Sequence, residues 1–229
     1  MQKNLKIIVI IAFLLIIAGV LFLENNNSSQ EQNYQTLANE SIGTVEKCIY
    51  GNENAGTSIA LITGIHPREK LSIEPEIKAA KEFANDNVKI IHYKVTVTDR
   101  PDDYDVGRDN GEKLVHDYVN PDVTKSDAGA VIISHSHMSG YGEGFYLATP
   151  EMDNASVKIA ETIKNESDFN YYPVTGQETY KSTSAVLVSK PIAQAGYPTF
   201  VYEIPEDITN DTATTKTVEL FEMISKIIS

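Results

Sequence analysis

Several strand-length segments of this 229-residue chain are almost continuously apolar, and segments with helical spacing alternate with them. A strand that faces water on one side alternates apolar and polar residues, whereas a strand buried on both faces does not. The strands are expected at residues 44–51, 57–64, 88–97, 128–137, 144–150 and 198–205, and the helices at residues 72–86, 110–119, 154–165, 184–196 and 212–228. This alternation predicts an α/β fold with a mixed, mostly parallel sheet and helices on both faces.

The chain begins with an apolar run that stands apart from this pattern. The 17 residues from Ile7 to Leu23 include no charged or polar side chain. At about 1.5 Å per residue the run spans roughly 25 Å, close to the ~30 Å hydrocarbon core of a bilayer. Lys3 and Lys6 precede it, which places the N-terminus in the cytoplasm. We expect one transmembrane helix in the cell membrane and an extracytoplasmic domain, with a cleaved signal peptide as the alternative.

Composition divides the chain into three parts and excludes some partners. We expect a cytoplasmic stub and anchor over residues 1–23, a polar flexible tether over 24–43 and a folded domain over 44–229. The 32 acidic and 19 basic residues give a net charge of −13, which argues against nucleic acid as a partner. The single cysteine, Cys48, excludes an intrachain disulfide and a cysteine-rich metal site.

The segment SIALITGIHPRE carries the first chemical motif. An apolar strand runs through Gly64, which permits a tight turn, into His66 and Glu69. Imidazole nitrogen and carboxylate oxygen both bind zinc, and a catalytic zinc site takes three protein ligands and keeps one position open. The alternative is a polar surface loop in which the H-x-x-E spacing arises by chance.

The segment VIISHSHMSG offers another ligand at a second strand end. His135 and His137 are two residues apart, so both point to the same side of an extended segment. One can bind a metal while the other lines the pocket or supports a ligand. Ligands bind beyond the carboxyl ends of strands in open α/β sheets, which favours this interpretation over two incidental loop histidines.

A glutamate lies inside the last expected strand, YPTFVYEIPE. Glu203 is flanked there by Val201, Tyr202 and Ile204. An unpaired buried carboxylate is costly, so Glu203 is expected to be functional or to belong to a structural ion pair. A carboxylate beside zinc and its water can act as the general base. Glu143, in GYGEGF, is the alternative base.

The segments GIHPRE, SHSH and TFVYEIPE resemble the zinc carboxypeptidases of the carboxypeptidase A type and the related succinylglutamate desuccinylase and aspartoacylase deacylases. Both groups have the order H-x-x-E, a histidine at a strand end, and a glutamate in a late strand. The resemblance implies zinc as the cofactor, with His66, Glu69 and His135 as ligands and Glu203 as the general base. The HPRE sequence is similar to the peptidase form of the motif.

The resemblance also implies residues around the metal. Tyr180, 23 residues before the expected base, matches a mobile catalytic tyrosine of the peptidases. Arg108 and Asn110 match side chains that grip the substrate carboxylate. Apart from the resemblance, Arg68 or Arg108 is expected to steady the oxyanion or the substrate carboxylate, and His137 to line the pocket or support a ligand.

These features together predict a membrane-anchored, extracytoplasmic zinc peptidase that hydrolyses a peptide or a cell-wall amide bond. The expected partners are a peptide or amino-acid-derived substrate and the membrane. Two alternatives remain: a zinc-dependent deacylase of N-acyl amino acids, and a non-catalytic binding module that retains the fold. The chain is short for the peptidases, so we expect some substrate-shaping loops to be missing.

Overall fold

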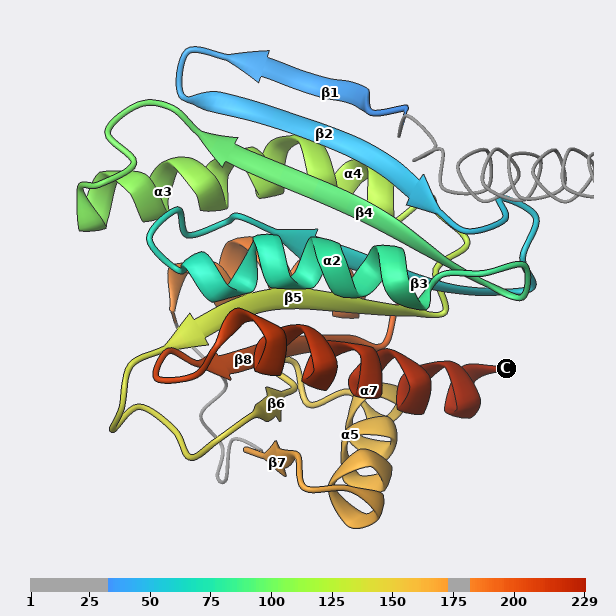
Figure 1. Cartoon of the computed structure of the whole chain (residues 1–229). Helices are drawn as coiled ribbons and strands as arrows, with labels where there is room; N and C mark the ends of the chain where they lie inside the picture. The colour runs from blue at the N-terminus through green and yellow to red at the C-terminus, as the bar shows by residue number, and fades with distance from the viewer. Residues whose placement is uncertain (1–32, 173–181) are drawn as a thin grey trace, which may run out of the picture. The chain divides into compact units, whose positions relative to one another are not determined.

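The computed structural model describes residues 33–172 and 182–229, and an eight-stranded sheet runs through them in the order β1-β2-β4-β3-β5-β8-β6-β7 (Figure 1). The strands are β1 (Gln35–Glu40), β2 (Gly43–Tyr50), β3 (Thr57–Thr63), β4 (Val88–Val97), β5 (Ala130–His137), β6 (Tyr146–Ala148), β7 (Asn170–Tyr171) and β8 (Thr199–Pro205). The α-helices are α2 (Glu74–Phe83), α3 (Tyr104–Leu114), α4 (Asn120–Val123), α5 (Asn154–Glu166), α6 (Lys190–Gln194) and α7 (Asn210–Ile228). Shorter helical segments are η1 (Lys70–Ser72), η2 (Val115–Val119) and η3 (Ala185–Ser189).

The centre of the sheet is parallel, and antiparallel pairs flank it. The four parallel pairs are β4–β3, β3–β5, β5–β8 and β6–β7. The three antiparallel pairs are β1–β2, β2–β4 and β6–β8. The prediction of a mixed α/β sheet is therefore confirmed, and the strand expected at residues 88–97 coincides with β4.

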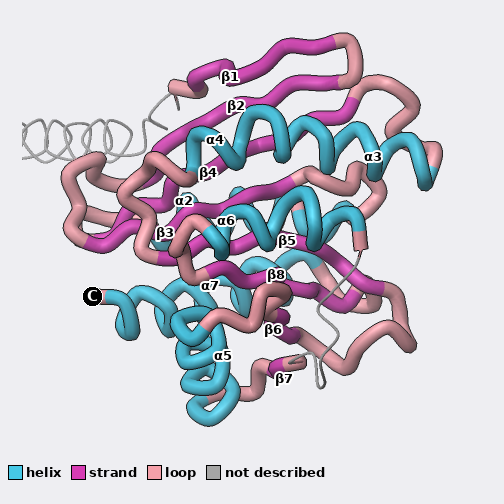
Figure 2. The backbone as a smooth tube through the Cα atoms, turned by 180° about the vertical axis from the view of Figure 1, so that it is seen from behind, coloured by secondary structure: helices cyan, strands magenta, loops and turns pink. Residues whose placement is uncertain are grey.

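Helices cover both faces of the sheet, which explains why the central strands are continuously apolar. Figure 1 shows α2, α5 and α7 on one face, and Figure 2, seen from behind, shows α3, α4 and α6 on the other. Along β3, Ile59 and Leu61 pack in the apolar cluster under α2 and α7. Ala60 and Ile62 pack in the cluster on the opposite face. All four side chains are fully buried, so both faces of β3 are apolar along its centre.

The edge strand β1 occupies part of the segment expected to be a tether. It pairs antiparallel with β2, and Ala38 in its middle is buried. The hydroxyl groups of Tyr34 and Tyr50 lie 2.7 Å apart, which fixes the start of the strand. An edge strand is held mainly by backbone hydrogen bonds and needs few apolar side chains. Residues 33–43 therefore belong to the folded domain, and not to the tether expected over 24–43.

The predicted membrane anchor at residues 7–23 lies outside the described residues. Within residues 33–172 and 182–229, no helix combines the length and apolar content needed to cross a bilayer.

Candidate active site

The carboxyl ends of β3, β5 and β8 meet at one edge of the sheet, because these strands are adjacent and parallel. At the end of β3 the chain turns at Gly64, whose φ is 80°. A Cβ atom at Gly64 would lie 2.1 Å from the backbone oxygen of Val95, so only glycine fits this turn. The turn directs His66 and Glu69 toward β5.

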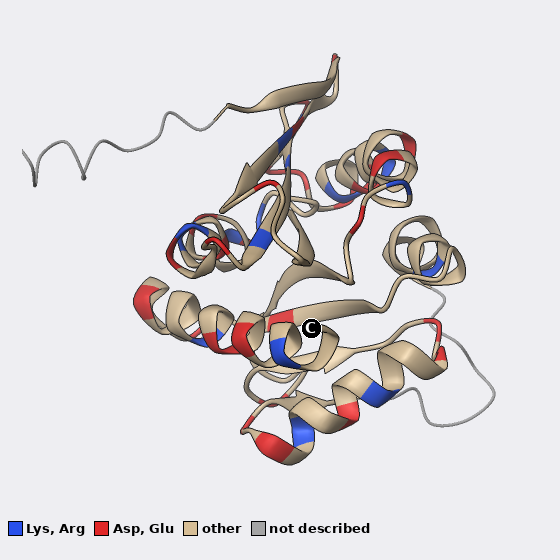
Figure 3. Ribbon diagram, turned by 90° about the vertical axis from the view of Figure 1, so that its right-hand side faces the viewer, with Lys and Arg blue, Asp and Glu red and all other residues tan. Residues whose placement is uncertain are grey.

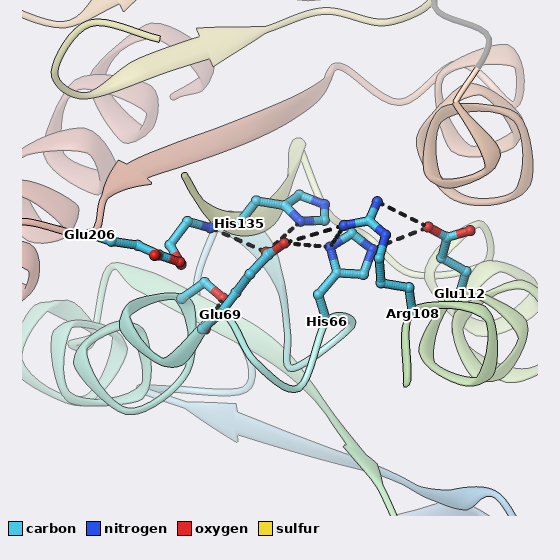
Figure 4. A network of polar contacts seen from close by, with 8 residues as sticks. His66, Glu69, Arg108, Glu112, His135 and Glu206 are labelled. Carbon is cyan, nitrogen blue, oxygen red and sulfur yellow. Dashed lines mark hydrogen bonds and ion pairs between the residues drawn. The ribbon is translucent and has the colours of Figure 1, made fainter. Parts of the chain in front are cut away.

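The three predicted metal ligands come together at this edge (Figure 4). Nδ1 of His66 lies 2.7 Å from Oε1 of Glu69, and Nδ1 of His135 lies 2.9 Å from Oε2 of the same carboxylate. The ligand atoms of the three residues all lie within 4.8 Å of one another. Two imidazoles and one carboxylate make up the three protein ligands of a catalytic zinc site, so the donor set fits that ion.

Glu69 is held in its ionised form. Burial opposes its ionisation, but the charge of His135 and hydrogen bonds from His135 and His66 hold the pKa of Glu69 far below its usual range. The backbone nitrogen of Ser136 also donates to Oε2 of Glu69 at 3.2 Å. The carboxylate therefore carries a full negative charge for a cation.

Glu112 also contacts the metal-ligand group, although no motif in the sequence singled it out. It is fully buried on α3, and its Oε1 lies 3.1 Å from Nε2 of His66. A carboxylate that accepts a hydrogen bond from the ring nitrogen not bound to the metal fixes the orientation of a histidine ligand and increases the basicity of its metal-binding nitrogen. Burial raises the pKa of Glu112, but the hydrogen bond to His66 and the charges of His66 and Arg108 lower it overall. Glu112 thus turns Nδ1 of His66 toward Glu69.

A sequence signal for Glu112 existed in the segment GRDNGEKL. Arg108 and Glu112 are four residues apart, which places them on the same face of a helix. The helix was expected to begin at residue 110, whereas α3 begins at Tyr104 and Asp103 caps it by accepting from the backbone nitrogen of Val106 at 3.0 Å. Because the expected helix began after Arg108, the four-residue spacing between Arg108 and Glu112 could not be recognised as one helix face.

Two arginines lie near the ligands. Nη1 of Arg108 lies 3.1 Å from Nδ1 of His66 and 3.5 Å from Oε1 of Glu69, and its Nη2 lies 3.6 Å from Oε1 of Glu112. The guanidinium groups of Arg68 and Arg108 stack over the ring of Tyr104 at 5.7 and 5.4 Å. Tyr104, the first residue of α3, therefore holds the guanidinium groups of both arginines on one side of the metal ligands.

Glu203 lies opposite His135 in the register of β5 and β8, and both side chains line the same pocket. Burial, with smaller effects from the charges of Glu69 and Glu206, raises the pKa of Glu203 to about 7, although His135 and Arg108 act in the opposite direction. A carboxylate with a pKa near neutrality can accept a proton from water and release it again. This property suits a general base.

Of two other predicted residues, His137 lies in the pocket wall as expected and Asn110 does not. His137 lines the pocket, but its ring nitrogens face the carbonyl oxygens of Met138 at 3.2 Å and Gly144 at 3.0 Å. It therefore joins the two ends of the loop after β5 and lies outside the three-residue metal group. Asn110 donates to the carbonyl oxygen of Asp99 at 3.1 Å and is not among the residues that line the pocket.

Two candidates remain, Tyr180 and Glu143. Tyr180 lies outside the described residues. Glu143 is exposed and is not among the pocket-lining residues, so the structure gives no support to it as the alternative base.

The pocket has a volume of about 440 Å³, and the metal ligands, Glu203, His137 and both arginines line it. The metal ligands, Glu203 and the two arginines form its polar part. Ala148, Pro150 and Val201 add an apolar part. A pocket of this size with a few convergent polar groups is typical of a small-substrate site.

No protein-family model and no curated protein sequence matches the chain. Solved structures do match. A metallo-carboxypeptidase from Burkholderia cenocepacia aligns with a TM-score of 0.58 at 13% identity, covering 91% of this chain and 69% of that one. A candidate carboxypeptidase from Burkholderia mallei aligns with a TM-score of 0.61 at 14% identity, covering 90% and 66%. The apo form of the cell shape determinant protein Csd4 from Helicobacter pylori aligns with a TM-score of 0.52 at 11% identity, covering 80% and 54%.

The chain therefore has the fold of the metallo-carboxypeptidases, as the resemblance of its motifs implied. The identities of 11–14% establish the fold alone. The chain spans 54–69% of the length of these neighbours, as its small size suggested.

Proposed function

We propose that this chain is a zinc-dependent hydrolase that cuts an amide bond in a peptide. One arrangement carries the proposal: Nδ1 of His66 and Nδ1 of His135 converge on the carboxylate of Glu69, with Glu203 on the next strand in the same pocket. This arrangement supplies three metal ligands and a base with a pKa near neutrality. The metallo-carboxypeptidase fold supports the same reaction class.

The mechanism assigns a step to each side chain. His66, Glu69 and His135 would hold the zinc, which when bound would supply a Lewis acid for the scissile carbonyl and lower the pKa of water. Glu203 takes a proton from the attacking water as the water oxygen bonds to the amide carbon. Glu203 then returns the proton to the amide nitrogen as the C–N bond breaks, which releases a carboxylate and an amine. Arg108 binds the carboxylate of the substrate through its two Nη atoms.

We place the reaction outside the cytoplasm, at the cell membrane. The apolar run at residues 7–23 and the lysines that precede it support this location. Peptides and cell-wall peptide cross-links are the amide substrates available there. One structural neighbour is a cell shape determinant, which agrees with a substrate in the cell wall.

Hydrolysis of N-acyl amino acids is the second candidate function. A pocket of about 440 Å³ can hold a molecule of that size without further subsites. Both reactions use the same zinc ligands and the same base, so they differ only in what occupies the rest of the pocket. Turnover of a free peptide or of an N-acyl amino acid separates them.

Metal analysis of the purified full-length protein tests the shared basis of both candidates. We expect about one zinc per chain and strongly weakened binding in His66→Ala, Glu69→Ala and His135→Ala. His116→Ala is the matched control, because His116 is exposed on η2 and lies outside the metal group and the pocket wall. Full zinc binding by all three ligand variants would refute the site. Zinc binding without turnover of either substrate would identify a binding module.

A further inference from the structure

Most charged side chains that line the pocket already have partners in the domain. His66, Glu69 and His135 bind one another as the metal group, and Arg108 contacts two of the carboxylates around it. Asp103 also lines the pocket, but its carboxylate caps the N-terminus of α3. Glu203 is the proposed base. Glu206, three residues beyond it, is the one acidic residue of the described pocket wall that has not yet been given a role.

Glu206 is exposed to solvent, yet it is held in a defined position. Its backbone nitrogen donates to the carbonyl oxygen of His137 at 3.0 Å. Its Oε1 accepts from Oγ of Ser136 at 3.0 Å, and the backbone nitrogen of Ser136 donates in turn to Glu69. Glu206 is therefore tied to the strand that carries His135. Within the described part of the chain, no lysine or arginine forms an ion pair with Glu206.

The positive charge of the pocket lies at the other end. Figure 4 shows Glu206 and Arg108 on opposite sides of the group formed by His66, Glu69 and His135. Arg68 shares the Tyr104 ring with Arg108, so both guanidinium groups belong to the Arg108 side. The pocket is therefore bipolar, with a cationic end, the metal ligands in the middle and an anionic end.

We propose that Glu206 determines specificity by binding an ammonium group of the substrate on the acyl side of the scissile amide. This inference rests on the proposed function, because the direction of the substrate follows from it. If the arginines bind the terminal carboxylate and the scissile carbonyl lies at the metal ligands, the acyl side extends toward Glu206. The substrate class is then a peptide with a positively charged residue directly before the residue that is released.

The contacts of Glu206 suit it to this role. A carboxylate fixed on one oxygen by Ser136 keeps lone pairs on the other for an N⁺–H donor, and such charge-assisted hydrogen bonds are stronger than neutral ones. Because Glu206 is exposed, water screens the interaction, and the gain is smaller than for a buried pair. The net charge of −13 acts in the same direction, because it attracts cationic peptides and repels anionic ones.

The test compares two peptides that differ in a single ammonium group. Acetyl-Ala-Lys-Ala carries lysine before the released alanine, and acetyl-Ala-norleucine-Ala replaces lysine by a side chain of similar length without charge. We expect the zinc-loaded full-length protein to cleave the lysine peptide with a kcat/KM about tenfold higher, the scale of one screened charge-assisted hydrogen bond. In Glu206→Gln this ratio should fall toward one, mainly through KM. The preference in the unmodified protein should weaken at high salt.

Glu222→Gln is the control, because it removes one negative charge from an exposed position on α7, away from the pocket. It should keep the preference for lysine.

Calorimetric binding of both peptides is measured in parallel. Equal cleavage and equal binding of the two peptides, or an unchanged preference in Glu206→Gln, would overturn the role of Glu206 and leave the peptidase function standing. Preferred binding of the lysine peptide without cleavage would overturn the peptidase function and keep the role of Glu206. Absence of both binding and cleavage would overturn both.

Discussion

At the scale of single residues, the site depends on a buried carboxylate that is not itself a ligand. Glu112 contacts Nε2 of His66, the nitrogen that faces away from Glu69. Glu112→Gln should therefore leave the three ligands in place but weaken the interaction that orients the His66 ring. Loss of such an outer partner typically reduces metal affinity about 10–100-fold. Zinc affinity measured by competition with a chelator should fall on that scale, with the circular dichroism spectrum unchanged. Unaltered affinity would show that Glu112 has no part in the site.

A second buried carboxylate makes stability depend on pH. Glu76 on α2 is fully buried, accepts from Oγ1 of Thr217 at 2.6 Å, and has a pKa raised by burial to about 8. The folded protein therefore keeps a proton that the unfolded chain releases above its ordinary pKa, about 4.3. The stabilisation is fully present below that value and is lost as the pH rises through about 8.

The measurement for Glu76 is thermal unfolding as a function of pH. We expect the melting temperature to fall between pH 5 and pH 8 in the unmodified protein. Glu76→Gln cannot ionise, so most of this decline should disappear in the variant. An equally steep decline in Glu76→Gln would assign the pH dependence to other groups.

At the scale of elements, the sequence predicted the buried strands well and the edges poorly. The strands β3 and β5 contain long apolar runs, and β4 and β8 are rich in β-branched and aromatic residues, so all four stand out without any tertiary information. The strand β1 could not be recognised in the sequence. It is held to β2 by backbone hydrogen bonds, which leave no apolar pattern in the side chains. The helix expected from residue 72 begins at Glu74, because residues 70–72 form η1, where Ser72 donates to the carbonyl oxygen of Glu69.

The edge strand gives a prediction about where the domain begins. A chain that starts at residue 42 lacks β1 and exposes the edge of β2, whereas one that starts at residue 33 retains it. The shorter chain should melt at a lower temperature and aggregate more readily, because an open strand edge can pair with other molecules. Equal melting temperatures and equal solubility of the two chains would show that β1 contributes nothing to the domain.

At the scale of the whole molecule, the site is assembled from segments far apart in the sequence. His66, His135 and Glu203 could be identified as candidates because each lies within an apolar strand or shortly after one. Their convergence depends on the strand order β3-β5-β8, which no local pattern determines. Figure 3 shows that acidic and basic positions lie mostly on the helices and loops, with few on the central strands. Among the described acidic and basic residues that line the pocket, only Glu203 lies on a strand, so only Glu203 is an exception to this distribution.

The hydrolysis rate of zinc-loaded Glu203→Gln tests the central claim most directly. Glutamine keeps the size of the side chain but cannot take a proton from water. If Glu203 is the general base, the variant should bind zinc, melt near the temperature of the unmodified protein and lose about 10²–10⁴-fold in turnover. A folded, zinc-loaded Glu203→Gln protein that hydrolyses its substrate at the unmodified rate would contradict the mechanism.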